Sequence, residues 1–202
     1  MRNGADVWLR DFLGTLGFSE YFFLPLVTVG LLLGWHHVTK RDWKLRPEVI
    51  SGMLCESFLV GLMILVIAQV FSQWIPTDDA TAAVRDFAGP VKQVPYMLSF
   101  LGAGIYEELL FRLILLSGAI AFCRSIGTDK TSAITLSVVA ISLLFAAAHY
   151  KLFFHAGLDF TWYSFVFRVF AGALFSVLFL YRGFGIVVGT HVVYDVLVAT
   201  IT

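Results

Sequence analysis

The chain carries acidic, basic and imidazole side chains inside its most apolar stretches. They are Glu107, Glu108, Arg112, His149, His191 and Asp195. Burying a charged side chain at the centre of a membrane helix costs on the order of 2.5–3.5 kcal/mol on insertion scales, so such groups persist where they pair, line a wet cavity or take part in chemistry. Carboxylates and imidazoles held out of bulk water suit proton transfer and hydrolysis. The combination predicts an enzyme within a membrane.

Composition supports the membrane class. Of 202 residues, 59% are hydrophobic and 14% are charged, with a mean hydropathy of +0.85, whereas soluble domains are about 45–50% apolar and about 25% charged. The net charge is zero, which gives no indication of a nucleic-acid partner. Cys55 and Cys123 lie in apolar segments and are interpreted as packing residues. No cofactor or metal is expected.

The helices that must position these groups can be located from hydropathy, because a membrane span needs about 20 predominantly apolar residues. The six candidates are 20–38, 49–71, 95–123, 131–150, 162–181 and 184–201. We therefore predict an all-α, polytopic membrane protein with about six transmembrane helices. Residues 1–19 predict an amphipathic surface segment, 20–202 a single helical membrane domain with its motif-bearing core at 95–202, and 72–94 an extramembrane loop.

Loop charges predict an orientation in the membrane, but the candidate site residues would then lie at different depths in the bilayer. Lys40, Arg41, Lys44 and Arg46 follow the first span, which favours that face in the cytoplasm and both termini outside. In straight, parallel helices, Glu107 and His149 would lie about 24–27 Å from the cytoplasmic ends and His191 only about 10 Å. A last segment that starts deep in the bilayer, or one partial crossing, would be needed to bring them together.

Spacing separates the two neighbouring carboxylates. Glu108 and Arg112 are four residues apart, so on a helix they stack one turn apart and can pair. Glu107 points away and lacks this partner. The alternative is that all three form a buried ion-pair cluster that only fixes helix packing.

The two histidines also have structural alternatives. His149 follows three alanines, which let another helix approach its ring closely, but a core histidine that bonds a backbone carbonyl fits as well. His191 and Asp195 are four residues apart and share a helical face. A simple intrahelical hydrogen bond is the alternative there.

Taken together, these motifs resemble a known family. Glu107-Glu-x-x-x-Arg112, Phe145-x-x-x-His149 and His191-x-x-x-Asp195 follow one another on successive apolar segments. This order is similar to that of the CPBP family, which comprises CAAX prenyl endopeptidases and bacteriocin-processing membrane proteins, also called glutamic intramembrane proteases. The resemblance covers about 95–200.

The resemblance implies an endopeptidase that uses neither a metal nor a covalent intermediate. Glu107 would be the general base on a water molecule, and His149 would help to hold that water. His191 and Asp195 would stabilise the oxyanion, with Glu108, Arg112 and Phe145 in support. The substrate would be a membrane-anchored or membrane-emerging peptide or protein in contact with the lipid bilayer, and the compact chain suits a prokaryotic inner membrane.

Two other functions use the same residues. Histidines and carboxylates are ordinary ligands of Zn²⁺, so a metal-dependent membrane protease is possible in principle, although no His-Glu-x-x-His motif is present. A non-catalytic immunity or scaffold protein is the other alternative. Glu56 is an unexplained charge in the second span, able to pair with Arg112 or Arg168 or to line a substrate path. Four polar residues are expected at an interface or cavity mouth, namely Lys151, His155, Asp159 and Arg168.

Asp195 departs from the family pattern, which often has Asn at this position, and generates a prediction. An ionised Asp cannot donate a hydrogen bond to an oxyanion, so we expect Asp195 to orient and charge His191, whose imidazolium is the donor. Asp195→Asn should then keep substantial peptidase activity, whereas His191→Ala should abolish it, in a cleavage assay with membrane-anchored peptides. Near-complete loss in Asp195→Asn would contradict this role.

Overall fold

The computed structural model describes residues 23–40, 42–44, 46–74, 101–102, 104–150 and 160–201. Its elements are α2 (Phe23–Val38), α3 (Pro47–Trp74), η1 (Leu109–Leu116), α6 (Ser117–Ser125), α7 (Lys130–Ala147), α8 (Trp162–Arg182) and α9 (Phe184–Ile201). Residues 104–108 are helical and run directly into η1, so 104–125 form one continuous helix. No β-strand occurs within these ranges, which confirms the predicted all-α class.

Three of these helices are long and apolar enough to cross a membrane: Pro47–Gln73, Lys130–Ala147 and Trp162–Arg182. Pro25–Val38 and Phe184–Thr200 are apolar but shorter. The class of helical membrane protein is therefore confirmed, while the count of six spans remains a prediction. The amphipathic segment at 1–19 and most of the loop at 72–94 lie outside the described residues, and α3 extends to Trp74, beyond the predicted start of that loop.

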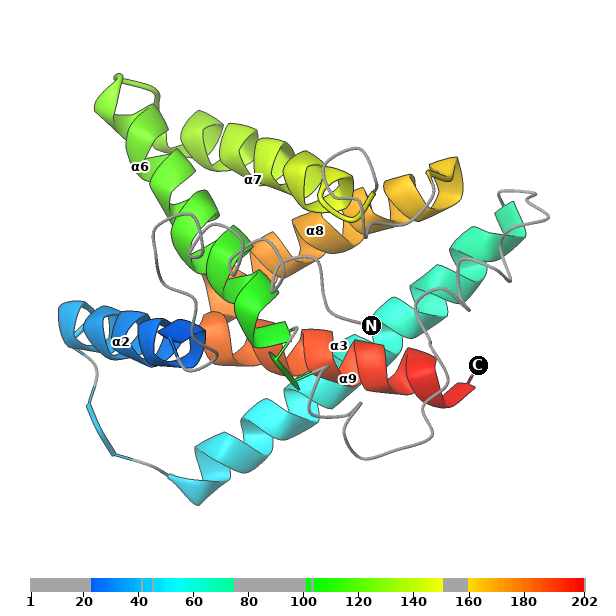
Figure 1. The fold of residues 1–202 in the computed structure, drawn as a ribbon, viewed down its shortest axis with the longest axis horizontal. Helices are drawn as coiled ribbons and strands as arrows, with labels where there is room; N and C mark the ends of the chain where they lie inside the picture. Colours follow the sequence, from blue (N-terminus) through cyan, green and yellow to red (C-terminus); the bar gives the residue numbers. More distant parts are fainter. Residues whose placement is uncertain are drawn as a thin grey trace.

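The helices do not run parallel to one axis. In Figure 1, α7 and α8 lie side by side, α9 crosses in front of α3, and the helix 104–125 runs obliquely between the two pairs. The different depths expected for Glu107, His149 and His191 were calculated for straight, parallel spans. Because the helices cross obliquely, residues at different distances from their own helix ends can meet at the centre.

Glycine and serine allow α3 and α9 to pack closely. A Cβ atom added to Gly189 would lie 2.5 Å from Ser57 Oγ, and one added to Gly61 would lie 2.7 Å from Val193 Cγ1. Ser57 Oγ also donates a hydrogen bond to the Ile186 carbonyl at 3.4 Å. Small residues at helix crossings bring backbones together in membrane proteins. This crossing holds the part of α9 that carries the predicted site residues.

The helix ends have local causes in the sequence. Asp129 caps α7 by accepting a hydrogen bond from the Ser132 N–H at 2.9 Å. The same backbone N–H holds the pKa of Asp129 below its ordinary value, because it stabilises the ionised carboxylate. At the C-terminal end of α8, Gly183 has φ of +88°, a conformation that favours glycine. It ends α8 and lets the chain turn into α9 after one residue.

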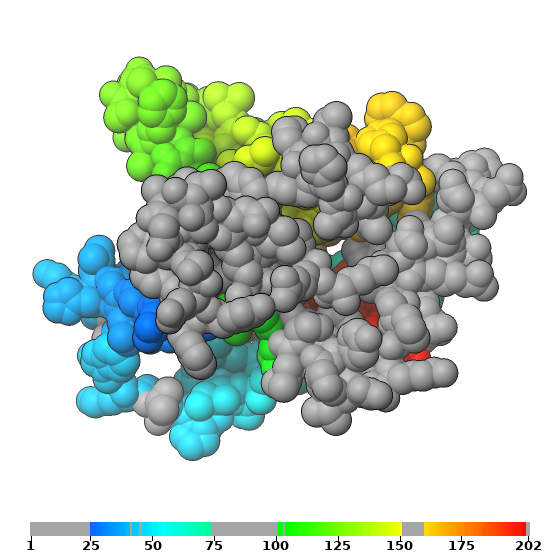
Figure 2. All heavy atoms as spheres, viewed as in Figure 1, coloured from blue at the N-terminus to red at the C-terminus, as the bar shows by residue number. Residues whose placement is uncertain are grey.

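Apolar side chains divide between a core and an outer surface. The core contains five buried phenylalanines: Phe111, Phe145, Phe167, Phe175 and Phe179. Large apolar side chains also project outward, among them Leu54 and Leu59 on α3 and Leu136 on α7. The space-filling view shows α2 and α6 at the edges of the molecule (Figure 2). Exposed apolar residues along whole helices are what contact with lipid requires.

The close crossing of α3 and α9 predicts a compensated substitution. Gly189→Ala should lower the melting temperature, because its Cβ would overlap Ser57 and push α9 away from α3. The swapped variant Ser57→Gly/Gly189→Ala should recover much of the loss, since it returns the lost space. Gly52→Ala is the matched control, because no atom lies within 4 Å of its added Cβ. Equal behaviour of Gly189→Ala and Gly52→Ala in thermal unfolding would refute this packing argument.

Candidate active site

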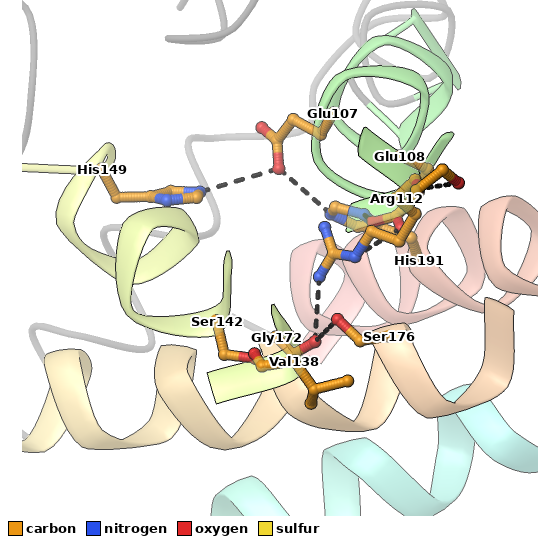
Figure 3. A network of polar contacts seen from close by, with 10 residues as sticks. Glu107, Glu108, Arg112, Val138, Ser142, His149, Gly172, Ser176 and His191 are labelled. Carbon is orange, nitrogen blue, oxygen red and sulfur yellow. Dashed lines mark hydrogen bonds and ion pairs between the residues drawn. The ribbon is translucent and has the colours of Figure 1, made fainter. Parts of the chain in front are cut away.

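Glu107 lies between two imidazole rings at the centre of the bundle. Its Oε2 atom is 3.7 Å from Nε2 of His149 and 3.7 Å from Nε2 of His191, and the residue is 5% exposed. Figure 3 shows the carboxylate pointing into the space between the two rings. Both distances exceed hydrogen-bond length, so the contacts are electrostatic. Three helical segments that are far apart in the chain therefore bring the predicted catalytic groups together.

His149 lies in the turn that follows α7. Its Nδ1 atom is 2.8 Å from the carbonyl oxygen of Phe145, which is the backbone contact that the structural alternative predicted. A carbonyl oxygen only accepts hydrogen bonds, so Nδ1 carries a proton. In a neutral ring, Nε2 is then an acceptor facing Glu107. The backbone contact thus sets the tautomer that the site sees. The His149 side chain is 23% exposed, more than that of Glu107 or His191.

His191 on α9 is contacted by carboxylates at both ring nitrogens. Nδ1 donates to Glu108 Oε1 at 2.6 Å, while Nε2 lies 3.6 Å from Asp195 Oδ2. A hydrogen bond of 2.6 Å to a carboxylate is a strong, charge-assisted contact. Glu108, rather than Asp195, therefore makes the closest contact that orients this ring, and Asp195 lies on the same side of it as Glu107.

Glu108 also pairs with Arg112, as predicted from their spacing. Oε2 is 3.0 Å from Arg112 Nε, and neither side chain is exposed. The two oxygens of one carboxylate thus bind a guanidinium and an imidazole. Arg112 Nη2 donates further to the Gly172 carbonyl at 3.4 Å, which also accepts from Ser176 Oγ at 2.8 Å (Figure 3).

Aromatic rings complete the surroundings of Arg112. Its Cζ atom lies 4.3 Å from the ring centroid of Phe145, 5.3 Å from that of Phe175 and 5.9 Å from that of Phe111. A cation over ring faces gains electrostatic stabilisation in a dry interior. Phe145 also contacts His149 edge-on, at 4.8 Å between ring centroids. Phe145, which was predicted to be a supporting residue, therefore contacts both Arg112 and His149.

The helix that carries these groups is distorted. Residues Leu109–Leu116 form a π-helix, and the Ser117 hydroxyl donates to the Arg112 carbonyl at 3.3 Å. Short π-helical segments occur often at functional sites. The π-helix is not predictable from the sequence, because the run Leu-Leu-Phe-Arg-Leu-Ile-Leu-Leu contains no residue type that signals an altered helical register.

One sequence-based placement was wrong, and both pairings considered for Glu56 are contradicted. Arg168, expected at an interface or cavity mouth, is 3% exposed, and its Nη1 donates to the Tyr150 hydroxyl at 3.4 Å. It faces inward because it shares a buried helical face with Gly172, a pattern that the sequence did offer. Glu56 pairs with neither Arg112 nor Arg168. Its two oxygens contact Nε and Nη2 of Arg182, the first at 2.5 Å, because α3 passes the end of α8.

The other interface residues, Lys151, His155 and Asp159, lie outside the described residues. Among the residues that are described, no group of three or more His, Cys, Asp or Glu side chains is arranged to hold a metal ion.

A buried cluster of acids and imidazoles, held by apolar helices, defines a helical membrane protein with a site suited to hydrolysis. A model of the type II CAAX prenyl endopeptidase Rce1-like family matches residues 91–197, more than half of the chain and the part that contains every candidate site residue. The chain belongs to this family, which confirms the resemblance found in the motifs. No curated protein and no solved structure matches the chain.

Membership of this family, together with the apolar helices, has direct consequences. The protein is an integral membrane protein and a CAAX-type intramembrane protease, and hence a hydrolase. Its substrate is membrane-associated.

Arg112 and His191 share the carboxylate of Glu108. We therefore expect that substitutions can separate its effect on stability from its effect on activity. Glu108→Leu should destabilise the protein by about 3–5 kcal/mol, because it leaves the Arg112 charge buried without its partner. The double variant Glu108→Leu/Arg112→Met should recover most of this stability and remain inactive, since His191 has lost the acceptor at Nδ1. Denaturant unfolding in detergent and peptide cleavage measure the two effects.

Glu56→Gln provides the comparison. The Arg182 side chain is 56% exposed, so breaking this pair should change stability by about 1 kcal/mol or less. A double Glu108/Arg112 variant that cleaves peptide at the wild-type rate would show that Glu108 has no part beyond balancing Arg112.

Proposed function

We propose that the protein hydrolyses a peptide bond of a membrane-anchored or membrane-emerging substrate by a glutamic mechanism, with Glu107 as the general base. The observation that carries this proposal is the position of Glu107 Oε2, at 3.7 Å from the Nε2 atoms of both His149 and His191. Glu108 is engaged by Arg112 and His191 through both oxygens. Glu107 is thus the carboxylate of the pair that faces away from Arg112 and is available to a reacting water.

His149 holds the attacking water in this proposal. With Nδ1 protonated and bonded to the Phe145 carbonyl, Nε2 of the neutral ring accepts one hydrogen bond from the water, and Glu107 accepts the other. A water that donates both protons in this way directs a lone pair at the substrate carbonyl. General-base catalysis requires this kind of geometry.

His191 stabilises the negative charge that forms on the carbonyl oxygen. Attack of the water forms a carbon–oxygen bond and transfers a proton to Glu107, leaving a tetrahedral oxyanion. Glu108 at Nδ1 and Asp195 near Nε2 favour a protonated His191, whose Nε2–H donates to that oxyanion. On collapse, the carbon–nitrogen bond breaks and Glu107 returns the proton to the leaving nitrogen, which yields a carboxylic acid and an amine.

The family description supports a first substrate to test. Members are described as type II CAAX prenyl endopeptidases, so we propose a lipid-modified C-terminal CAAX peptide as the substrate class. The lipid would hold the peptide at the bilayer, and the peptide bond would enter the polar centre between α7, α9 and the helix 104–125.

Substitution of Glu107 tests the mechanism. Purified protein in detergent should cleave quenched, lipid-modified CAAX peptides, and Glu107→Gln should lower the rate by about 10²–10⁴-fold, the usual contribution of a general base. Glu56→Gln is the matched control, because it removes a carboxylate from another apolar helix outside the site. Each protein is assayed with and without a strong chelator.

The outcomes distinguish the mechanisms. Activity that survives the chelator and disappears in Glu107→Gln supports the glutamic mechanism. Loss of activity with the chelator alone would replace it with a metal-dependent one. Absence of cleavage by folded wild-type protein across CAAX peptides would favour a non-catalytic role for this chain.

A further inference from the structure

Helix α8 carries none of the three motifs, yet it places an aromatic ring directly on His191. The rings of Phe175 and His191 are stacked, with centroids 4.9 Å apart and planes inclined by 17°. Phe175 is 2% exposed. Of the ring contacts within 7 Å that His191 makes with described residues, this is the closest, and the other, with Phe145, is edge-on at 6.4 Å. The contact covers a face of the imidazole.

The same Phe175 ring lies against Arg112. The Arg112 Cζ atom is 5.3 Å from the Phe175 centroid, and Glu108 binds both Arg112 and His191. Phe175 therefore packs against two groups that already share one carboxylate. Gly172, one turn earlier, lets α8 pack closely on α7, because an added Cβ there would lie 3.2 Å from Phe145 Cδ1 and from Ser142 Cα.

A stacked ring fixes a degree of freedom that the hydrogen bond leaves open. Glu108 holds His191 at Nδ1, but a hydrogen bond tolerates a range of distances and angles, so the ring can still rock about its Cβ–Cγ bond. A parallel ring on its face resists this rotation. The direction of Nε2 toward Glu107 and Asp195 then follows from the two contacts together.

We propose that Phe175 is a positioning residue of this site, which sets the plane of His191 so that Nε2 faces the reacting carbonyl. The proposal rests on the proposed role of His191 in hydrolysis. It adds a fourth helix to the three that carry the motifs, and a side chain without any ionisable group to the catalytic arrangement.

The ring pose can be measured in the wild-type protein without any activity. Ring nitrogens and protons of ¹⁵N-labelled histidine are observed by NMR in detergent, and with only five histidines in the chain the His191 signals can be assigned from their loss in His191→Gln. Stacking on Phe175 should shift the carbon-bound ring protons of His191 upfield. Unshifted protons would overturn the proposed stack, whatever the outcome of the cleavage assays.

Two matched substitutions test the consequence. Phe175→Leu should alter the His191 signals and lower kcat about 10-fold with KM changed less than about threefold, because binding groups stay intact while one stack and one cation–π contact are lost. Phe179→Leu makes the same truncation one turn further along α8, at a core residue that is 9% exposed. It should lower stability without altering the His191 signals or kcat.

Phe175→Tyr retains the ring and should restore kcat to within about threefold of wild type by preserving the stack. Equal losses of kcat in Phe175→Leu and Phe179→Leu, with unchanged His191 signals in both, would reduce Phe175 to a packing residue. If no peptide is cleaved by wild type, the proposed hydrolytic function fails, and the NMR comparison still decides whether Phe175 sets the plane of His191.

Discussion

The burial of the Glu108 carboxylate is the constraint on which the rest of the site depends. Neither Glu108 nor its partner Arg112 is exposed, and an ion taken out of water must be compensated by opposite charge and hydrogen bonds. Glu108 meets this requirement by binding Arg112 with one oxygen and His191 with the other. Because these partners come from two helices, the same compensation that makes the charge tolerable also locks α9 against the helix 104–125. Glu107, the preceding residue, points about 100° away around the same helix, toward the two imidazole Nε2 atoms.

Close helix packing makes this compensation possible. The α3–α9 crossing has Gly189 against Ser57, and the α7–α8 crossing has Gly172 against Ser142 and Phe145. An added Cβ would overlap Ser57 at the first crossing and would be tightly packed against Ser142 and Phe145 at the second. In lipid, where apolar surface gives little drive for helices to associate, such packing and interhelical polar contacts supply the association. The small residues and the charged residues are therefore parts of one arrangement: the former let the helices approach, and the latter hold them in register.

Contacts between residues close together in the chain were predictable from the sequence, whereas contacts between distant residues were not. The Glu108–Arg112 pair was predictable because the partners are one helical turn apart, and the distinct status of Glu107 followed from the same geometry. The partner of Glu56 was not, since Arg182 is distant in the chain and meets it only where α3 passes the end of α8. Arg168 was placed at an interface because its charge was considered without the buried face that it shares with Gly172.

The sequence by itself determined the helical membrane class, the family and the ionisable residues that carry the motifs, because these depend on hydropathy, on local spacing and on residue type. Only the tertiary structure decided the contacts between groups on different helices. It gave His191 its closest carboxylate from Glu108 rather than from Asp195, four residues away on the same helix. It also stacked Phe175 on that imidazole. These contacts join separate helices, and their geometry depends on the crossing of those helices and on the π-helical register of η1, neither of which is encoded in a local pattern.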